Sequence, residues 1–190
     1  MTDQLDESVR PKSYLTSSFA LVAFLLATMW AVEFVDSALL ESRLEASGIV
    51  PRKKEGLDGV IWAPFLHGAQ THLVANSIPL LVLGGLVATW GRARWLAVTL
   101  IVVLLGGAAT WLFGRFGNHI GASGLVFGYF GFLVGAVVFE RKFWPLIPAT
   151  VAIVLFGSAI VGGLVPTAGV SWEGHAFGAL AGVTAARVTS

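Results

Sequence analysis

The sequence predicts an all-α membrane protein, a bundle of six transmembrane helices. Hydrophobic residues make up 56% of the 190 positions and charged residues only 12%, whereas a soluble domain carries about 25% charged residues. The apolar residues gather in six segments, each near the ~20 residues needed to cross the hydrocarbon core. A net charge of +1 does not fit the concentrated basic face of a nucleic-acid binder. The absence of cysteine excludes disulfides, thiolate metal sites and a cysteine nucleophile.

The first apolar segment is longer than the 7–15 apolar residues of a signal peptide and is followed by further spans, so we expect a retained helix. Before it, residues 1–14 form a short polar tail that we expect to be disordered and cytoplasmic. The connection at about 38–68 mixes charged and apolar residues, which favours an element lying in the membrane interface. The membrane domain therefore covers residues 15–190, with helices expected at about 15–37, 69–90, 94–114, 121–139, 143–163 and 172–189.

The basic residues indicate the orientation of the bundle. Seven lie in the tail, the second and fourth connections and the C-terminal end, and five lie in the first and third connections. Because cytoplasmic loops are enriched in Lys and Arg, we expect both termini in the cytoplasm. The second, fourth and sixth helices then share a direction, and their N-terminal ends meet at the outer face.

Polar residues mark these three N-terminal ends. The second helix opens with His67, His72 and Asn76, the fourth with Ser123 and the sixth with His175. Polar side chains at membrane depth are costly and normally face a protein interior or a water-filled cavity. Their coincidence on one side predicts a single functional site.

Glycines predict how the fourth and sixth helices meet. Those of the fourth are spaced 3, 4, 3 and 4, and those of the sixth 4 and 4, which keeps each set on one helical stripe. Small residues at this spacing let membrane helices pack backbone to backbone. Such packing would bring Ser123 within hydrogen-bond distance of His175. The two stripes are Gly121, Gly124, Gly128, Gly131 and Gly135, and Gly174, Gly178 and Gly182.

This juxtaposition points to nucleophilic catalysis. A serine hydroxyl is a poor nucleophile until a neighbouring base takes its proton, and His175 is the obvious base for Ser123. The flanking glycines allow close approach of a substrate carbonyl, and the helix N-terminus supplies free amide donors and the positive end of the dipole. His72 and Asn76, four residues apart on one helix face, would add side-chain donors for an oxyanion.

Other site chemistries fit less well. The residues Gly121-Ala-Ser-Gly-Leu do not complete G-x-S-x-G, and no strand precedes them, which excludes an α/β-hydrolase elbow. His67 and His72 are five apart with no glutamate between them, so we expect no zinc site and no other metal. Glu173 is two positions from His175, on nearly the opposite helix face, which favours a Ser–His dyad over a triad.

Three further polar residues are expected to be passive. His119 sits in a loop just before the fourth helix, where a structural role is the simpler interpretation. Glu33 and Asp36, three apart near the outer end of the first helix, are candidates for a proton relay. Because they lie at the interface, we expect them to be solvated.

At these residues the chain resembles a rhomboid intramembrane serine protease, from about residue 15 to the end. Three motifs carry the resemblance, one in each of the second, fourth and sixth helices and in the family's order. They are His67-x₄-His72-Leu-x₂-Asn76, Gly121-Ala-Ser-Gly124, and His175-Ala-Phe-Gly178-Ala-Leu-Ala-Gly182.

The resemblance implies a role for each matched residue. Ser123 would be the nucleophile and His175 the base, without a cofactor. His72, Asn76 and the backbone of Ser123 would form the oxyanion hole, and His67 would be structural. The reaction would be hydrolysis of a peptide bond in or next to a transmembrane segment of a membrane-protein substrate.

The resemblance also implies the setting of that reaction. The partners would be substrates with transmembrane segments and the lipid bilayer, with no nucleic acid. Water would reach the site through a cavity open to the outer face of the plasma membrane. The fifth helix and its following loop would act as a lateral gate and cap.

The chain departs from the family pattern at two positions. Family members often carry Trp-Arg in the first loop, whereas here Trp62 is followed by Ala63. Many members have a tyrosine four residues after the serine, stacked on the catalytic histidine, and here that residue is Phe127. A phenyl ring keeps the stacking and loses the hydroxyl.

Two other classes of function remain open at this point. A catalytically silent rhomboid-like pseudoprotease would bind membrane clients, although such relatives usually lose the serine or the histidine. A small transporter or channel would be expected to show inverted repeats and paired ionisable residues near the midplane. The two halves of the chain show no convincing repeat.

Overall fold

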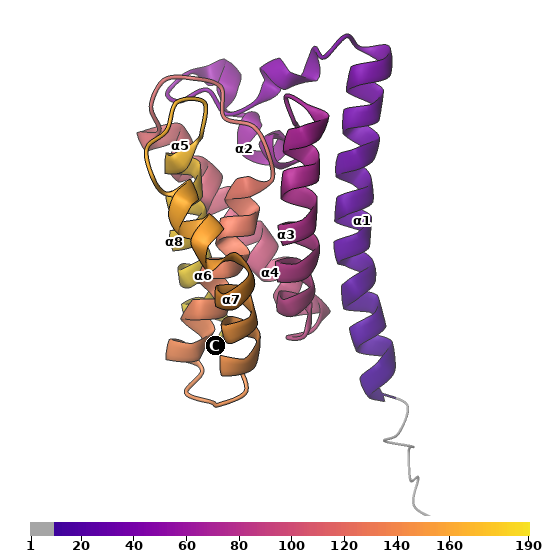
Figure 1. Cartoon of the computed structure of the whole chain (residues 1–190), viewed down its shortest axis with the longest axis vertical. Helices are drawn as coiled ribbons and strands as arrows, with labels where there is room; N and C mark the ends of the chain where they lie inside the picture. The colour runs from indigo at the N-terminus through magenta and orange to yellow at the C-terminus, as the bar shows by residue number, and fades with distance from the viewer. Residues whose placement is uncertain (1–9) are drawn as a thin grey trace, which may run out of the picture.

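The computed structural model of the chain describes residues 10–190 and contains no β-strand within that range. The long helices run roughly along one axis, and short helical pieces and loops cross one end of the bundle (Figure 1). An isolated antiparallel bridge between Ile49 and His119 joins two of these crossing loops. The expected all-α bundle is therefore confirmed for the described residues.

The N-terminal part differs in detail from the prediction. Helix α1 covers Arg10–Leu39 and so begins inside the stretch expected to be a tail. Residues 1–9, the rest of that expected tail, lie outside the described range. The first connection is built from four short pieces, η1 (Leu44–Ser47), η2 (Lys54–Gly56), α2 (Gly59–Trp62) and η3 (Ala63–Phe65).

The remaining helices follow in the expected order. One continuous helical stretch contains a π-helical turn, η4, between α4 and α5, in a run of apolar residues that gives no sign of it. Such turns interrupt α-helices rarely and often lie near functional sites. The elements are α3 (Gln70–Ala88), α4 (Arg92–Ile101), η4 (Val102–Gly106), α5 (Gly107–Phe113), α6 (Ser123–Phe139), α7 (Leu146–Gly163) and α8 (Trp172–Thr189).

The surface of the bundle is apolar. Within the described range, four helical stretches are long and apolar enough to cross a membrane, and α6 is a shorter apolar helix. Side chains such as Phe24, Leu100 and Val154 are more than half exposed. Exposed apolar side chains in such number suit contact with lipid, as in a membrane protein. The four stretches are Ser17–Leu39, Gln70–Ala88, Arg92–Phe113 and Leu146–Gly163.

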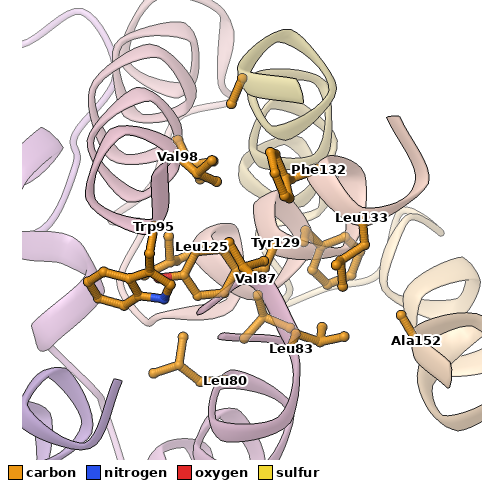
Figure 2. Close-up of a cluster of buried hydrophobic side chains, with 14 of the residues drawn as sticks. Leu80, Leu83, Val87, Trp95, Val98, Leu125, Tyr129, Phe132, Leu133 and Ala152 are labelled. Carbon is orange, nitrogen blue, oxygen red and sulfur yellow. The ribbon is translucent and has the colours of Figure 1, made fainter. Parts of the chain in front are cut away.

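The core lies around α6. Tyr129 and Phe132 of that helix are fully buried among side chains of α3, α4 and α7, as Figure 2 shows. The Tyr129 hydroxyl is 2.8 Å from Thr99 Oγ1, which satisfies a polar group in the apolar core. Because lipid tails are as apolar as these side chains, close packing, more than exclusion of water, holds the helices together.

Helices α6 and α8 pack backbone to backbone, as the glycine spacing predicted. A Cβ added to Gly178 would lie 2.1 Å from the Gly124 oxygen, and one added to Gly182 would lie 1.8 Å from the Gly128 oxygen. No side chain fits in these gaps. Gly121 does not belong to this stripe, contrary to the prediction, because it precedes α6 in a turn with φ +110°.

The acidic residues near the end of α1 are also not solvated as expected. Glu33 and Asp36 are both buried. The Asp36 Oδ1 accepts a hydrogen bond of 2.9 Å from the Leu44 amide, and the Asp36 carbonyl accepts from the Leu40 and Ser42 amides. Asp36 therefore ends the helix and turns the chain into the first connection.

Candidate active site

Ser123 and His175 meet at the centre of the site. Ser123 is the first residue of α6 and His175 lies in the first turn of α8. The His175 Nε2 is 2.8 Å from the Ser123 Oγ, and the imidazole is buried. The backbone contacts between the two helices hold these residues together, since neither helix can move without breaking that packing.

The second nitrogen of His175 fixes its tautomer. The Nδ1 lies 2.7 Å from the carbonyl oxygen of Gly163, at the end of α7. A carbonyl oxygen only accepts, so the Nδ1 carries the proton and donates it. The Nε2 is then an unprotonated acceptor facing the Ser123 hydroxyl. This is the arrangement that a general base requires.

The phenyl ring of Phe127 stacks on the imidazole of His175. The rings of Phe127 and His175 are 4.2 Å apart and tilted by only 9°. The stacking that the family usually obtains from tyrosine is thus present with a phenyl ring. A Cβ added to Gly163 would lie 2.5 Å from the Phe127 Cζ, so this ring fills the space between α6 and the end of α7.

Donor groups of α3 lie on the other side of the serine. A Cβ added to Gly121 would be 2.6 Å from the His72 Cε1 and 3.4 Å from the Asn76 Nδ2, so both side chains lie against the turn before Ser123. The Asn76 Nδ2 is buried and has no hydrogen-bond partner among the described residues. A buried unpaired donor is costly, and one beside a nucleophile is suited to bind an oxyanion.

His67 supports the turn that precedes the serine. Its Nε2 accepts a long hydrogen bond of 3.4 Å from the Ala122 amide, and its ring meets that of His72 edge to face at 5.1 Å. Burial, reinforced by the neighbouring His72, lowers the pKa of His67 to about 4. The ring is therefore neutral at pH 7 and remains an acceptor.

Two cavities reach the serine. One of about 710 Å³ contains the polar groups of the site and lies between the loop before α6 and the loop before α8. It is lined by His72, Asn76, Ser123 and His175 together with residues 115–120 and 169–171 and Gly68. A second, of about 50 Å³, lies beside Ser123 against the π-helical turn and the glycines of α8. Ser123 therefore borders both cavities.

Glu173 forms an ion pair with Arg115, and the expectation of a Ser–His dyad stays a prediction. Its Oε1 is 3.5 Å from the Arg115 Nε. The group that orients the imidazole is the Gly163 carbonyl, which sequence reasoning missed. No sequence signal could reveal it, because every residue has a backbone carbonyl.

The first loop is tied down despite the missing Trp-Arg pair. The Arg52 Nη1 donates to the carbonyls of Leu112 at 3.1 Å and Gly114 at 2.8 Å, and its guanidinium lies over the Phe116 ring at 4.6 Å. The arginine of that pair is absent here, because Trp62 is followed by Ala63. Arg52 instead joins the first loop to the end of α5.

Comparison with known proteins identifies the family. A model of the rhomboid domain matches residues 55–190. Uncharacterized proteins of Mycobacterium tuberculosis and Mycobacterium bovis are each 45% identical over 174 residues, which cover 87% of this chain and 72% of the relative. An uncharacterized protein of Mycobacterium leprae is 39% identical over 194 residues, covering 97% and 76%. The chain therefore belongs to the rhomboid family of membrane proteins.

Proposed function

We propose that this protein is an intramembrane serine endopeptidase that cleaves peptide bonds in or next to transmembrane segments of membrane-protein substrates. One observation carries the proposal. The His175 Nδ1–H is held by the Gly163 carbonyl while the Nε2 faces the Ser123 hydroxyl at 2.8 Å. A serine that serves only in helix packing needs no base in this tautomer.

The first half of the reaction forms an acyl-enzyme. The Ser123 Oγ attacks the substrate carbonyl carbon while the His175 Nε2 takes the hydroxyl proton. The resulting oxyanion accepts hydrogen bonds from the Asn76 amide, the His72 ring and the Ser123 backbone amide. His175 then gives the proton to the leaving nitrogen, the C–N bond breaks, and the new amino terminus departs.

The second half releases the acyl group. A water molecule from the cavity attacks the ester carbonyl while the His175 Nε2 takes one of its protons. The same donors bind the second oxyanion. The proton returns to the Ser123 Oγ as the ester bond breaks, which regenerates the hydroxyl and frees a carboxylic acid that loses its proton to water. The balance needs only water, so we propose no cofactor and no metal.

The apolar surface supports a membrane setting for this reaction. We place the bundle in the plasma membrane with both termini cytoplasmic and the active site open to the outer face, so that the partners are lipid and transmembrane substrates. In this arrangement α7 acts as the gate, and the loop 164–171, which borders the cavity, acts as the cap. Of the residues in that loop, Gly169, Val170 and Ser171 line the cavity.

A fluorophosphonate serine probe tests the proposal on the purified protein in detergent. Wild type should be labelled, Ser123→Ala should not be, and His175→Ala should lose labelling by at least about 10³-fold because the base is gone. Ser158→Ala, which removes an exposed serine of α7, is the matched control and should label like wild type.

Cleavage of a transmembrane substrate in liposomes provides the second measurement. Wild type should cleave and both dyad variants should not. Cleavage by purified Ser123→Ala would contradict the assignment of the nucleophile. A folded wild type that neither labels nor cleaves would overturn the proposed activity and direct attention to binding of membrane clients.

A further inference from the structure

His119 connects the loop before α6 to the start of α8. It was expected to be a passive loop residue, yet it is only 7% exposed. Its backbone is fixed by two hydrogen bonds with Ile49, of 2.9 and 3.0 Å. Its side chain reaches across to α8, where the Nδ1 lies 2.5 Å from the Ser171 Oγ.

The partners of the ring fix its protonation pattern. The His119 Nε2 is 3.0 Å from the Arg115 carbonyl oxygen, which only accepts, so the Nε2 carries the proton. The Nδ1 is then an acceptor and the Ser171 hydroxyl donates to it. Because both ring nitrogens are engaged, the ring cannot rotate without losing a buried hydrogen bond.

Ser171 links His119 to the proposed base, His175. It immediately precedes α8, and its carbonyl accepts the hydrogen bond of the His175 amide at 3.1 Å. Its hydroxyl makes no capping bond to the helix, so its hydrogen bond to His119 is what anchors the side chain. A shift of Ser171 therefore moves the turn that carries the imidazole.

Arg115, in the same loop as His119, contacts a different part of the chain. The Arg115 side chain donates to the carbonyls of Thr167 at 3.2 Å and of Val170, and pairs with Glu173. These contacts hold the loop that precedes α8 and, through the buried Glu173, the first turn of that helix. His119, by contrast, holds the residue whose carbonyl binds the His175 amide.

We propose that His119 is a positioning residue of the active site: by accepting the Ser171 hydroxyl it sets the first turn of α8 and keeps the His175 Nε2 in reach of Ser123. This inference rests on the proposed peptidase function. A misplacement near 1 Å can cost about 10²-fold in rate, and a partial loosening of one turn should cost about 10-fold. The loss should fall on kcat, since His119 is not proposed to bind substrate.

Two variants at position 119 separate the two ring contacts. The His119→Asn side chain can place its oxygen near the former Nδ1 and accept from Ser171. The His119→Gln side chain reaches the former Nε2 and binds the Arg115 carbonyl instead. Ser171→Thr keeps the hydroxyl and Ser171→Ala removes it.

The expected pattern is specific to the bond between His119 and Ser171. His119→Ala, His119→Gln and Ser171→Ala should each lower kcat about 10-fold with KM unchanged, and His119→Asn and Ser171→Thr should recover most of it. The double variant with Ala at both positions should be no worse than either single, because both remove one interaction. Additive losses, or variants with a lower melting temperature and an unchanged kcat, would overturn the proposal.

Amide hydrogen exchange separates this proposal from the proposed function. Exchange of the amides in residues 171–176 should be faster in His119→Ala and Ser171→Ala than in wild type and His119→Asn. If wild type proves inert, the peptidase assignment fails while exchange still tests the contact. Unchanged exchange in both Ala variants would refute the anchoring of α8 by His119.

Discussion

Helices α7 and α8 both pack against α6 but in different ways. Helix α8 approaches so closely that glycine faces a carbonyl oxygen, as at Gly182 and the Gly128 oxygen. Helix α7 buries only Pro148, Ala149, Ala152 and Ile160 out of 18 residues, and its remaining side chains face outward or are half-buried. The contact between α6 and α8 is therefore made by closely packed backbones, and the contact between α6 and α7 by a narrow strip of side chains.

The tight α6–α8 contact and the looser α6–α7 contact serve different purposes in the candidate site. Ser123 and His175, the proposed nucleophile and base, lie on α6 and α8, whose relative position is fixed by backbone contacts. The end of α7 contributes the Gly163 carbonyl, which orients the base. We expect α7 to be the helix that yields when a substrate enters, since few of its contacts would be lost.

The largest effect should come from Gly182→Ala. The added methyl would sit 1.8 Å from the Gly128 oxygen, so the helices must separate, and overpacking of this kind costs about 3 kcal/mol or more. We expect loss of the folded monomer in detergent, measured by thermal unfolding and by yield on size exclusion.

The matched control is Gly162→Ala in α7. A Cβ at this position meets no atom of the described residues within 4 Å, and alanine is the better helix former, so stability should change by less than about 1 kcal/mol. If the two variants unfold at the same temperature, the contrast between α7 and α8 is wrong.

The second largest effect should come from a substitution in α3, which lies on the side of Ser123 away from His175. Asn76→Ala removes the unpaired donor beside Gly121, and loss of one oxyanion donor typically costs about 10²-fold in rate. Because His72 and the backbone amide remain, the loss should be smaller than that of Ser123→Ala. Cleavage kinetics in liposomes measure it, and a kcat equal to wild type would exclude Asn76 from the oxyanion hole.

The third prediction tests whether the end of α7 positions the His175 ring. A methyl group at Gly163 would lie 2.5 Å from the Phe127 Cζ and 3.2 Å from the His175 Nδ1, so Gly163→Ala should displace the stacked ring. Loss of such ring contacts is worth about 1 kcal/mol, and kcat should fall about 10-fold or less. The adjacent Gly162→Ala should retain full activity. Equal activity of the two variants would show that the end of α7 does not position the base.

The sequence predicted the closely packed half better than the rest. Glycine spacing is a direct signal of helix contact, so the approach of Gly178 and Gly182 to α6 followed from it, and so did the meeting of Ser123 with His175. The boundary at Gly121 was wrong because a glycine suits both a helix stripe and a turn with positive φ.

Features that depend on long-range backbone contacts left no trace in the sequence. The π-helical turn Val102–Gly106 is as apolar as the turns around it. The burial of Asp36 follows from the return of the chain to the Leu44 amide. The bonds from Arg52 to the carbonyls of Leu112 and Gly114 join residues about sixty positions apart, and no local pattern encodes such a pairing.

The smallest effect should appear as a response to acid. The folded pKa of His67 is about 4, below the value near 6.5 of an unfolded chain. Between these values the unfolded state binds more protons, so the free energy of unfolding falls as the pH drops from about 6.5 towards 4. From pH 7 to pH 5.5, this one group should account for roughly 1 kcal/mol.

His67→Gln isolates this contribution. The glutamine oxygen can accept from the Ala122 amide as the imidazole Nε2 does, but it does not titrate. The other histidines are present in both proteins, so the difference between their unfolding curves at pH 7 and pH 5.5 reports His67 together with its influence on the neighbouring His72. Identical pH dependence of the two proteins would mean that His67 is not held neutral in the folded state. The hydrogen bond from the Ala122 amide to the His67 ring would then not explain how the turn before Ser123 is stabilised.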